Sequence, residues 1–224
     1  MVISHRHRYL YFVVPKCASS TVRESLRDLT DEGHPVTDSP QHVPLRRFLA
    51  SEHAALLGRY FAFTFVRNPY DRLYSGFLQD LKAASAYPKW MPVKKPIFDL
   101  IGADFNRYMR DYVQSADLAA DWEWICFCPM HEFVYLDGVC RLDWIGRAED
   151  VEGGLTELSR RLGVSIPKSA DVNVTSEYRG RLKHLGMYER ATVELVNDRY
   201  RDDFRLFGYE PLDPADFPIR LANA

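Results

Sequence analysis

Two uninterrupted apolar segments stand out along the chain, and each is followed by a pattern typical of a helix. Residues 9–14 (YLYFVV) and 60–66 (YFAFTFV) consist mostly of aromatic and β-branched side chains. Because polar residues do not alternate with apolar ones, both segments are typical of strands buried on both faces of a sheet. After the first segment, Val22, Leu26 and Leu29 recur at helical spacing, which predicts a helix there.

The second apolar segment leads into a helix with clear start signals. Asn68 suits the N-cap, Pro69 suits the first helical position and Asp71 lies in the first turn. From Leu73 onward, apolar side chains recur every four residues and mark the buried face. The chain therefore repeats a strand-to-helix unit.

Weaker patterns along the rest of the chain predict further elements. They are a short helix over 44–57, a loop over 83–96, a helix over 97–113, strands over 132–136 and 142–145, a helix over 151–162 closed by Gly163, and a last helix ending near Gly208. Strands that alternate with helices predict an α/β fold. We expect one domain over residues 1–224, with a central, mainly parallel β-sheet flanked by helices.

Composition and charge exclude several classes of protein. The 224 residues are 46% hydrophobic, and 29 Lys and Arg against 31 Asp and Glu give a net charge of −2. The hydrophobic fraction excludes wholesale disorder, and the charge balance argues against a nucleic-acid-coating protein. No apolar run approaches the roughly 18–20 residues of a membrane span, and no secretory signal is evident. We therefore expect a cytoplasmic protein without an integral membrane segment.

The four cysteines, Cys17, Cys126, Cys128 and Cys140, are too few for a disulfide scaffold, and reduced thiols are expected in a cytosol. Cys126 and Cys128 with Cys140 leave a metal site open as an alternative. The spacing is not that of paired C-x-x-C knuckles, so buried thiols without metal are the preferred interpretation.

The turn after the first predicted strand gathers groups that bind anions. Residues 15–21 (PKCASST) place Lys16 and three consecutive hydroxyls, Ser19, Ser20 and Thr21, at the start of a helix. Helix N-termini offer unpaired N–H groups and a positive dipole end, which favour phosphate. The alternative is a helix capped by these hydroxyls with a surface lysine. The Walker loop G-x-x-x-x-G-K-[ST] is absent.

The turn after the second strand adds a second cation at the carboxyl end of the sheet, where ligands bind in α/β folds. Arg67 follows the strand directly, and Ser75 lies about two helical turns later. The planar guanidinium of arginine suits phosphate. The alternative is an arginine paired with a carboxylate and a serine at the surface.

Taken together, PKCASST and FVRNPYDRLYSGF resemble the donor-binding signatures of the sulfotransferases that use 3′-phosphoadenosine-5′-phosphosulfate (PAPS). The likeness is strongest to the carbohydrate sulfotransferase group that includes heparan sulfate 2-O-sulfotransferase and its bacterial relatives. Residues 143–149 (DWIGRAE), 200–204 (YRDDF) and 207–209 (FGY) extend it, so it spans about residues 9–210. The resemblance implies a P-loop-like α/β domain.

The resemblance also implies roles for individual residues. An Arg and a Ser of the second signature, here Arg67 and Ser75, hold the 3′-phosphate in this family. The first loop holds the 5′-phosphosulfate, and here it comprises Lys16, Cys17, Ala18, Ser19, Ser20 and Thr21.

Sulfuryl transfer needs a cation near the leaving oxygen and a base for the acceptor hydroxyl. Lys16 is the expected cation, because negative charge grows on the oxygen bridging to the 5′-phosphate. His42 resembles the position of the family's base, with His131 and Glu123 as the reserve candidates. The alternative for His42 is a helix cap or a solvated loop residue. On this interpretation PAPS is the co-substrate, and catalysis needs no metal.

The acceptor side departs from the family pattern. Related sequences often carry His-x-x-Pro-Gln where this chain has CFCPM over 126–130, without the His or Gln. Cations and aromatic residues mix in one stretch, which is either a solvated basic loop or a binding surface for a sugar or an anionic acceptor: Lys82, Tyr87, Lys89, Trp90, Lys94 and Lys95.

The leading hypothesis is a sulfotransferase that modifies a hydroxyl of a glycan, glycolipid or small metabolite. One alternative is a P-loop kinase, which would need a Walker loop and magnesium ligands. Another is a non-catalytic nucleotide-binding protein with a degenerate acceptor site, which the departure over 126–130 supports.

Overall fold

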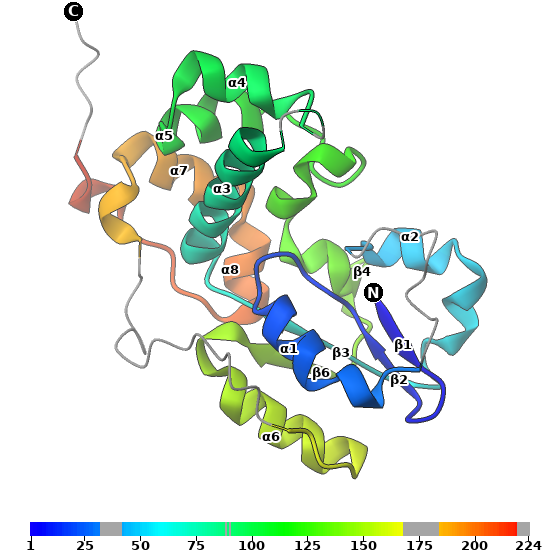
Figure 1. The fold of residues 1–224 in the computed structure, drawn as a ribbon. Helices are drawn as coiled ribbons and strands as arrows, with labels where there is room; N and C mark the ends of the chain where they lie inside the picture. The colour runs from blue at the N-terminus through cyan, green and yellow to red at the C-terminus, as the bar shows by residue number, and fades with distance from the viewer. Residues whose placement is uncertain (32–41, 88, 90, 168–183, 219–224) are drawn as a thin grey trace, which may run out of the picture. The chain divides into compact units, whose positions relative to one another are not determined.

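The computed structural model describes residues 1–31, 42–87, 89, 91–167 and 184–218, and Figure 1 shows their fold. Contacts divide the chain into two compact units. The first unit contains Met1–Arg67 and Met130–Arg181, and the second contains Asn68–Pro129 and Leu182–Ala224. The expectation of one domain over residues 1–224 stays a prediction.

The first unit is built on a four-stranded sheet in the order β1-β2-β3-β6. The strands are β1 (Val2–Ser4), β2 (Tyr9–Tyr11), β3 (Phe61–Val66) and β6 (Trp144–Arg147). The edge strand β1 is antiparallel to β2, whereas the pairs β2–β3 and β3–β6 are parallel. With the helices beside it, this sheet confirms the predicted α/β class and its mainly parallel sheet.

The two apolar segments of the sequence form the centre of this sheet. All three β2 residues are buried, as are five of the six in β3. The Tyr11 and Phe63 rings stack with centroids 5.0 Å apart, and the Thr64 hydroxyl donates to the Phe12 carbonyl at 2.6 Å. Regular β2 ends at Tyr11 instead of Val14, although the Phe12 N–H still donates to the Phe63 carbonyl of β3 at 2.9 Å.

Short helices and a hairpin complete the first unit (Figure 1). They are α1 (Ser19–Ser25), α2 (Leu45–Leu49), α6 (Val151–Leu162) and the pair β4 (Tyr135–Leu136) and β5 (Val139–Cys140), with 3-10 turns at Arg27–Leu29, Glu52–Leu56, Met130–Phe133 and Ala148–Asp150. As predicted, Gly163 closes α6 in the left-handed region, with φ of 65°.

The predicted strand over 132–136 is wrong in its first half. Residues Met130–Phe133 form a 3-10 turn, and only two residues of the segment pair in a hairpin. The hairpin loop consists of Asp137 and Gly138, both with positive φ (50° and 79°). A two-residue loop of this kind joins adjacent strands tightly, so the apolar segment pairs locally.

Two glycines allow close packing beside β3. A Cβ atom on Gly154 of α6 would lie 2.5 Å from the Phe65 ring, and one on Gly146 of β6 would lie 2.7 Å from it. These distances are far below a normal contact, so both positions exclude larger side chains. The missing side chain of Gly154 therefore lets α6 approach the sheet.

The second unit is helical. Its elements are α3 (Pro69–Ala86), α4 (Lys94–Ile101), α5 (Phe105–Tyr108), a π-helical turn (Met109–Val113), 3-10 turns at Trp122–Phe127, Leu185–Met187 and Pro214–Asp216, α7 (Arg190–Arg199) and α8 (Arg201–Phe207). The Asn68 side chain accepts from the Tyr70 N–H at 3.0 Å, which confirms the predicted N-cap of α3.

Helix boundaries in this unit differ from the sequence predictions. The loop predicted over 83–96 is shorter, because α3 continues to Ala86 and α4 begins at Lys94. The single helix predicted over 97–113 is interrupted at Gly102, which has φ of 63°. The last helix is divided at Tyr200 into α7 and α8.

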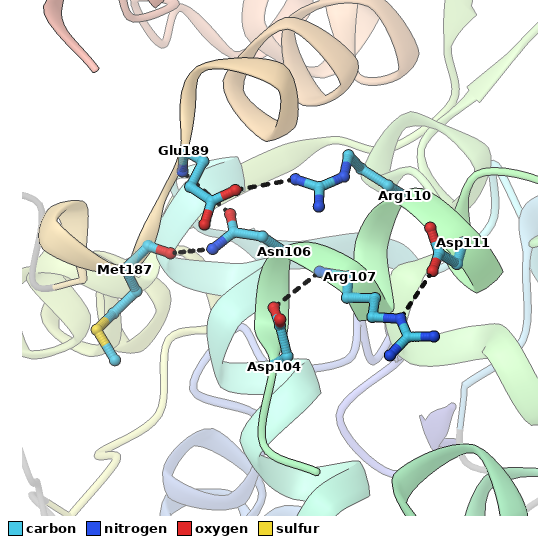
Figure 2. Close-up of polar contacts among 7 residues, drawn as sticks. All are labelled: Asp104, Asn106, Arg107, Arg110, Asp111, Met187 and Glu189. Carbon is cyan, nitrogen blue, oxygen red and sulfur yellow. Dashed lines mark hydrogen bonds and ion pairs between the residues drawn. The ribbon is translucent and has the colours of Figure 1, made fainter. Parts of the chain in front are cut away.

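Polar contacts tie α5 and the turn after it to the start of α7 (Figure 2). The Asn106 amide donates to the Met187 carbonyl at 3.0 Å and accepts from the Glu189 N–H at 3.0 Å. Arg110 pairs with the Glu189 carboxylate at 3.1 Å. Since Asn106 satisfies one donor and one acceptor of the same backbone segment, it holds that segment in a defined register.

A buried ion pair lies in the core of the second unit. Lys94 Nζ is 2.5 Å from Asp80 Oδ2, and the Tyr108 hydroxyl donates to the same oxygen at 2.9 Å. The side chains of Lys94 and Asp80 are only 3% and 5% exposed. Lys94 Nζ also lies 5.0 Å from the centroid of the Trp124 ring. Lys94 is therefore a core residue and is not available to bind an acceptor from a solvated loop.

We predict that Asp80→Ala lowers the free energy of unfolding by about 3–5 kcal/mol, because it leaves the buried Lys94 ammonium without its partner. The double variant Asp80→Leu/Lys94→Met removes both charges and should recover most of the loss. Urea unfolding measures both changes. Lys95→Ala is the control, because its pair with Asp99 is exposed and is worth less than about 1 kcal/mol. An equal loss in Asp80→Ala and Lys95→Ala would contradict the prediction.

Candidate functional site

The two predicted anion-binding turns meet within the first unit. One follows β2 and carries Lys16, and the other follows β3 and carries Arg67. Because β2 and β3 are parallel neighbours, their carboxyl ends lie at one edge of the sheet. There Arg67 Nη1 donates to the Lys16 carbonyl at 3.4 Å. The structure therefore brings together two residues that are 51 positions apart in the chain.

The backbone of the first turn has an unusual conformation. Lys16 and Ala18 both have positive φ (64° and 56°), although neither is glycine. A left-handed conformation costs a residue with a Cβ about 1–2 kcal/mol. Such strain concentrates at functional sites, and turns that include left-handed residues can direct successive N–H groups toward one anion. The conformation supports an anion-binding turn.

The hydroxyls of the first turn do not cap α1, which corrects the structural alternative for this segment. The N-cap of α1 is Ala18, and among the described residues no side chain bonds to the cap position. Ala18 is left-handed and lacks a side-chain oxygen, whereas a capping side chain extends from an N-cap residue in the β region. Ser19 and Thr21 are half-buried, and Ser20 is exposed.

Met130 lies beneath both turns. Its Sδ atom is 3.7 Å from Cys17 Sγ and 3.5 Å from the Arg67 backbone nitrogen, which donates to it. Met130 and Cys17 are fully buried. In the sequence, Met130 stands out only as part of the departure from the family pattern over 126–130. No local pattern could have revealed its position, because both contacts are to residues distant in sequence.

Burial also keeps the nearby Tyr11 side chain neutral. Tyr11 is fully buried on β2, and burial raises the pKa of its phenol far above the usual value of 10.0. The charge of an ionised Cys17 would raise that pKa further, whereas Arg23 lowers it. Tyr11 therefore contributes bulk and no charge beneath the first turn.

His42 lies beside the strand that leads into the first turn. Its Nδ1 is 2.8 Å from the Val13 carbonyl oxygen, which can only accept a hydrogen bond. Nδ1 therefore carries the proton, and Nε2 of the neutral ring carries the lone pair. The N-cap of α2 is Pro44, and no side-chain cap bond to it occurs among the described residues, so His42 does not serve as that cap. This tautomer suits a general base.

Comparison with known proteins identifies the family. The family model described as "Sulfotransferase family" matches residues 1–210. This chain belongs to the sulfotransferase family. A curated relative, carbohydrate sulfotransferase 10 of Xenopus laevis, is 22% identical over 242 residues. The alignment covers 93% of this chain and 66% of the relative, so the chain spans slightly less than two thirds of the relative's length. No solved structure matches significantly.

Three further site residues were predicted for this sulfotransferase-family chain outside the two turns, namely Ser75, His131 and Glu123. Ser75 is half-buried on α3 of the second unit, so its proposed role with Arg67 stays a prediction. Of the reserve bases, His131 lies in the first unit with Nε2 3.6 Å from Glu132 Oε1. Glu123 lies in the second unit, in the 3-10 turn at Trp122–Phe127.

The cysteines outside the first turn carry no bonds to one another. None of Cys126, Cys128 and Cys140 forms a disulfide within the described residues, and Cys128 is buried whereas Cys140 is exposed. Within the described residues, no group of three or more His, Cys, Asp or Glu side chains has the arrangement of a metal site. Among the same residues, none of the helices combines the length and apolarity that crossing a bilayer requires.

We predict that nuclear magnetic resonance of the histidine rings shows the Nδ1-protonated tautomer for His42 at pH 8, because the Val13 carbonyl accepts from this nitrogen. A ring-selective ¹⁵N–¹H correlation measures it, and His42→Gln assigns the signal by its loss. A proton on Nε2 instead of Nδ1 would contradict the prediction and remove the basis for a base role.

Proposed function

We propose that this chain transfers a sulfuryl group from PAPS to a hydroxyl of an acceptor, preferably a glycan. Membership of the sulfotransferase family supports the reaction class. The name of the carbohydrate sulfotransferase relative supports a glycan ahead of a glycolipid or small metabolite. The observation that carries the proposal is the 3.4 Å contact between Arg67 and the Lys16 carbonyl, which unites two cationic turns.

The donor's two phosphate ends match these two turns. The strained turn around Lys16 and Ala18 suits the 5′-phosphosulfate, because its backbone amides and one ammonium favour a tetrahedral anion. The Arg67 guanidinium suits the 3′-phosphate. Ser75 is proposed as its partner on the strength of the family resemblance. Cys17 is buried with its thiol against Met130, so it is proposed to support the turn by packing and not to contact the donor through its thiol.

The chemistry is an in-line displacement at sulfur. The acceptor oxygen forms a bond to sulfur while the bond from sulfur to the bridging oxygen of the 5′-phosphate breaks. The acceptor proton passes to Nε2 of His42, and the electron pair leaves with adenosine 3′,5′-bisphosphate. The Lys16 ammonium opposes the charge that grows on the leaving oxygen, so it stabilises the transition state more than the ground state.

We predict that adenosine 3′,5′-bisphosphate stabilises the protein, by about 2.7 kcal/mol at 100 times its dissociation constant. Arg67→Ala should weaken this binding on the order of 10–100-fold, because it removes a charge-assisted contact to phosphate. Thermal shift and calorimetry measure both effects, with Arg47→Ala on the exposed face of α2 as the control. Preference for ATP would favour a kinase, and no nucleotide binding would refute the donor site.

We predict that His42→Ala lowers kcat on the order of 10²–10⁴-fold, because it removes the base. The affinity for adenosine 3′,5′-bisphosphate should stay within about twofold, since the ligand lacks the acceptor. Transfer of radiolabelled sulfur from PAPS to a glycan panel measures activity. Nucleotide binding without transfer to any acceptor would favour the non-catalytic alternative, and full activity of His42→Ala would shift the base to His131 or Glu123.

A further inference from the structure

One buried thioether contacts both turns, the backbone N–H of Arg67 in one and the side-chain thiol of Cys17 in the other. Met130 Sδ accepts from the Arg67 N–H at 3.5 Å and lies 3.7 Å from the thiol of Cys17, the residue after Lys16. With the contact between Arg67 Nη1 and the Lys16 carbonyl, these interactions close a ring around the edge of the sheet. All the members of this ring belong to the first unit.

The chemistry of methionine explains why it can occupy this place. Arg67 is the first residue beyond β3, so its N–H has left the strand ladder and needs another acceptor. A thioether is a weak acceptor on a flexible, unbranched side chain, which fits irregular space and still receives a hydrogen bond. Because Met130 is fully buried, water does not compete for this bond.

We propose that Met130 is a positioning residue for the donor site, an inference that rests on the proposed function. Its sulfur sets the spacing between the Lys16 turn and Arg67, and so between the groups that hold the two phosphate ends. The hydrogen bond that the sulfur accepts comes from Arg67, which is proposed to hold the 3′-phosphate, whereas the chemical step takes place at the 5′ end of the donor. Loss of the sulfur acceptor should therefore raise KM for PAPS and leave kcat nearly unchanged.

Met130→Leu tests the inference, because it conserves volume and apolar character but removes the acceptor. We expect a rise of about 3–10-fold in the dissociation constant of adenosine 3′,5′-bisphosphate and in KM for PAPS, with kcat within about twofold. Met130→Gln returns an acceptor on an unbranched side chain of similar length and should restore affinity to within about twofold. The matched control is Met109→Leu, at a fully buried methionine of the second unit, which should leave affinity unchanged.

A second measurement does not depend on the nucleotide. Hydrogen exchange of the Arg67 amide should be on the order of 10-fold faster in Met130→Leu than in the wild type, and it should return toward the wild-type rate in Met130→Gln. If the wild type does not bind the bisphosphate, the proposed function fails, whereas the amide exchange still decides whether Met130 holds Arg67.

Three results would overturn the inference. The first is an unchanged affinity together with unchanged Arg67 exchange in Met130→Leu. The second is a Met130→Gln variant that stays as weak as Met130→Leu, since packing would then be the cause. The third is global unfolding of Met130→Leu, which would assign Met130 to the stability of the unit. Circular dichroism melts of all variants separate this last outcome from the other two.

Discussion

Parallel pairing of β2 with β3 is the constraint on which the proposed site depends. Parallel neighbours end at the same edge of a sheet, so the turns that follow them emerge side by side. The contact between Arg67 and the Lys16 carbonyl is the direct result of this register. An antiparallel pairing of the same segments would separate the two cations by the length of a strand. The two phosphate ends of one nucleotide could then not be assigned to both cations.

The first turn stores conformational strain that its surroundings must offset. Two residues with Cβ atoms are left-handed there, at a combined cost of about 2–4 kcal/mol. Burial of Cys17 between them and its contact with Met130 oppose relaxation of the turn. A turn held in this way keeps its amides oriented before a ligand arrives, which reduces the reorganisation that anion binding requires.

The helical unit uses its charges differently. Lys94 and Asp80 form a buried pair whose geometry is completed by the Tyr108 hydroxyl, so each charge has its partner inside the core. The same residue type, lysine, therefore lies in different surroundings in the two units. Lys16 follows β2 at the carboxyl end of the strand, whereas Lys94 begins α4 and its ammonium lies against the Trp124 ring in the core.

The two central strands, the Asn68 cap and the two cationic turns could be predicted from the sequence, because each rests on local periodicity or on neighbouring residues. The sequence could not determine the short hairpin strands, which depend on positive φ at Asp137 and Gly138. The burial of Lys94 and the position of Met130 could not be predicted from the sequence either. Both depend on contacts between segments distant in the chain, and periodicity carries no information about which distant side chains will meet.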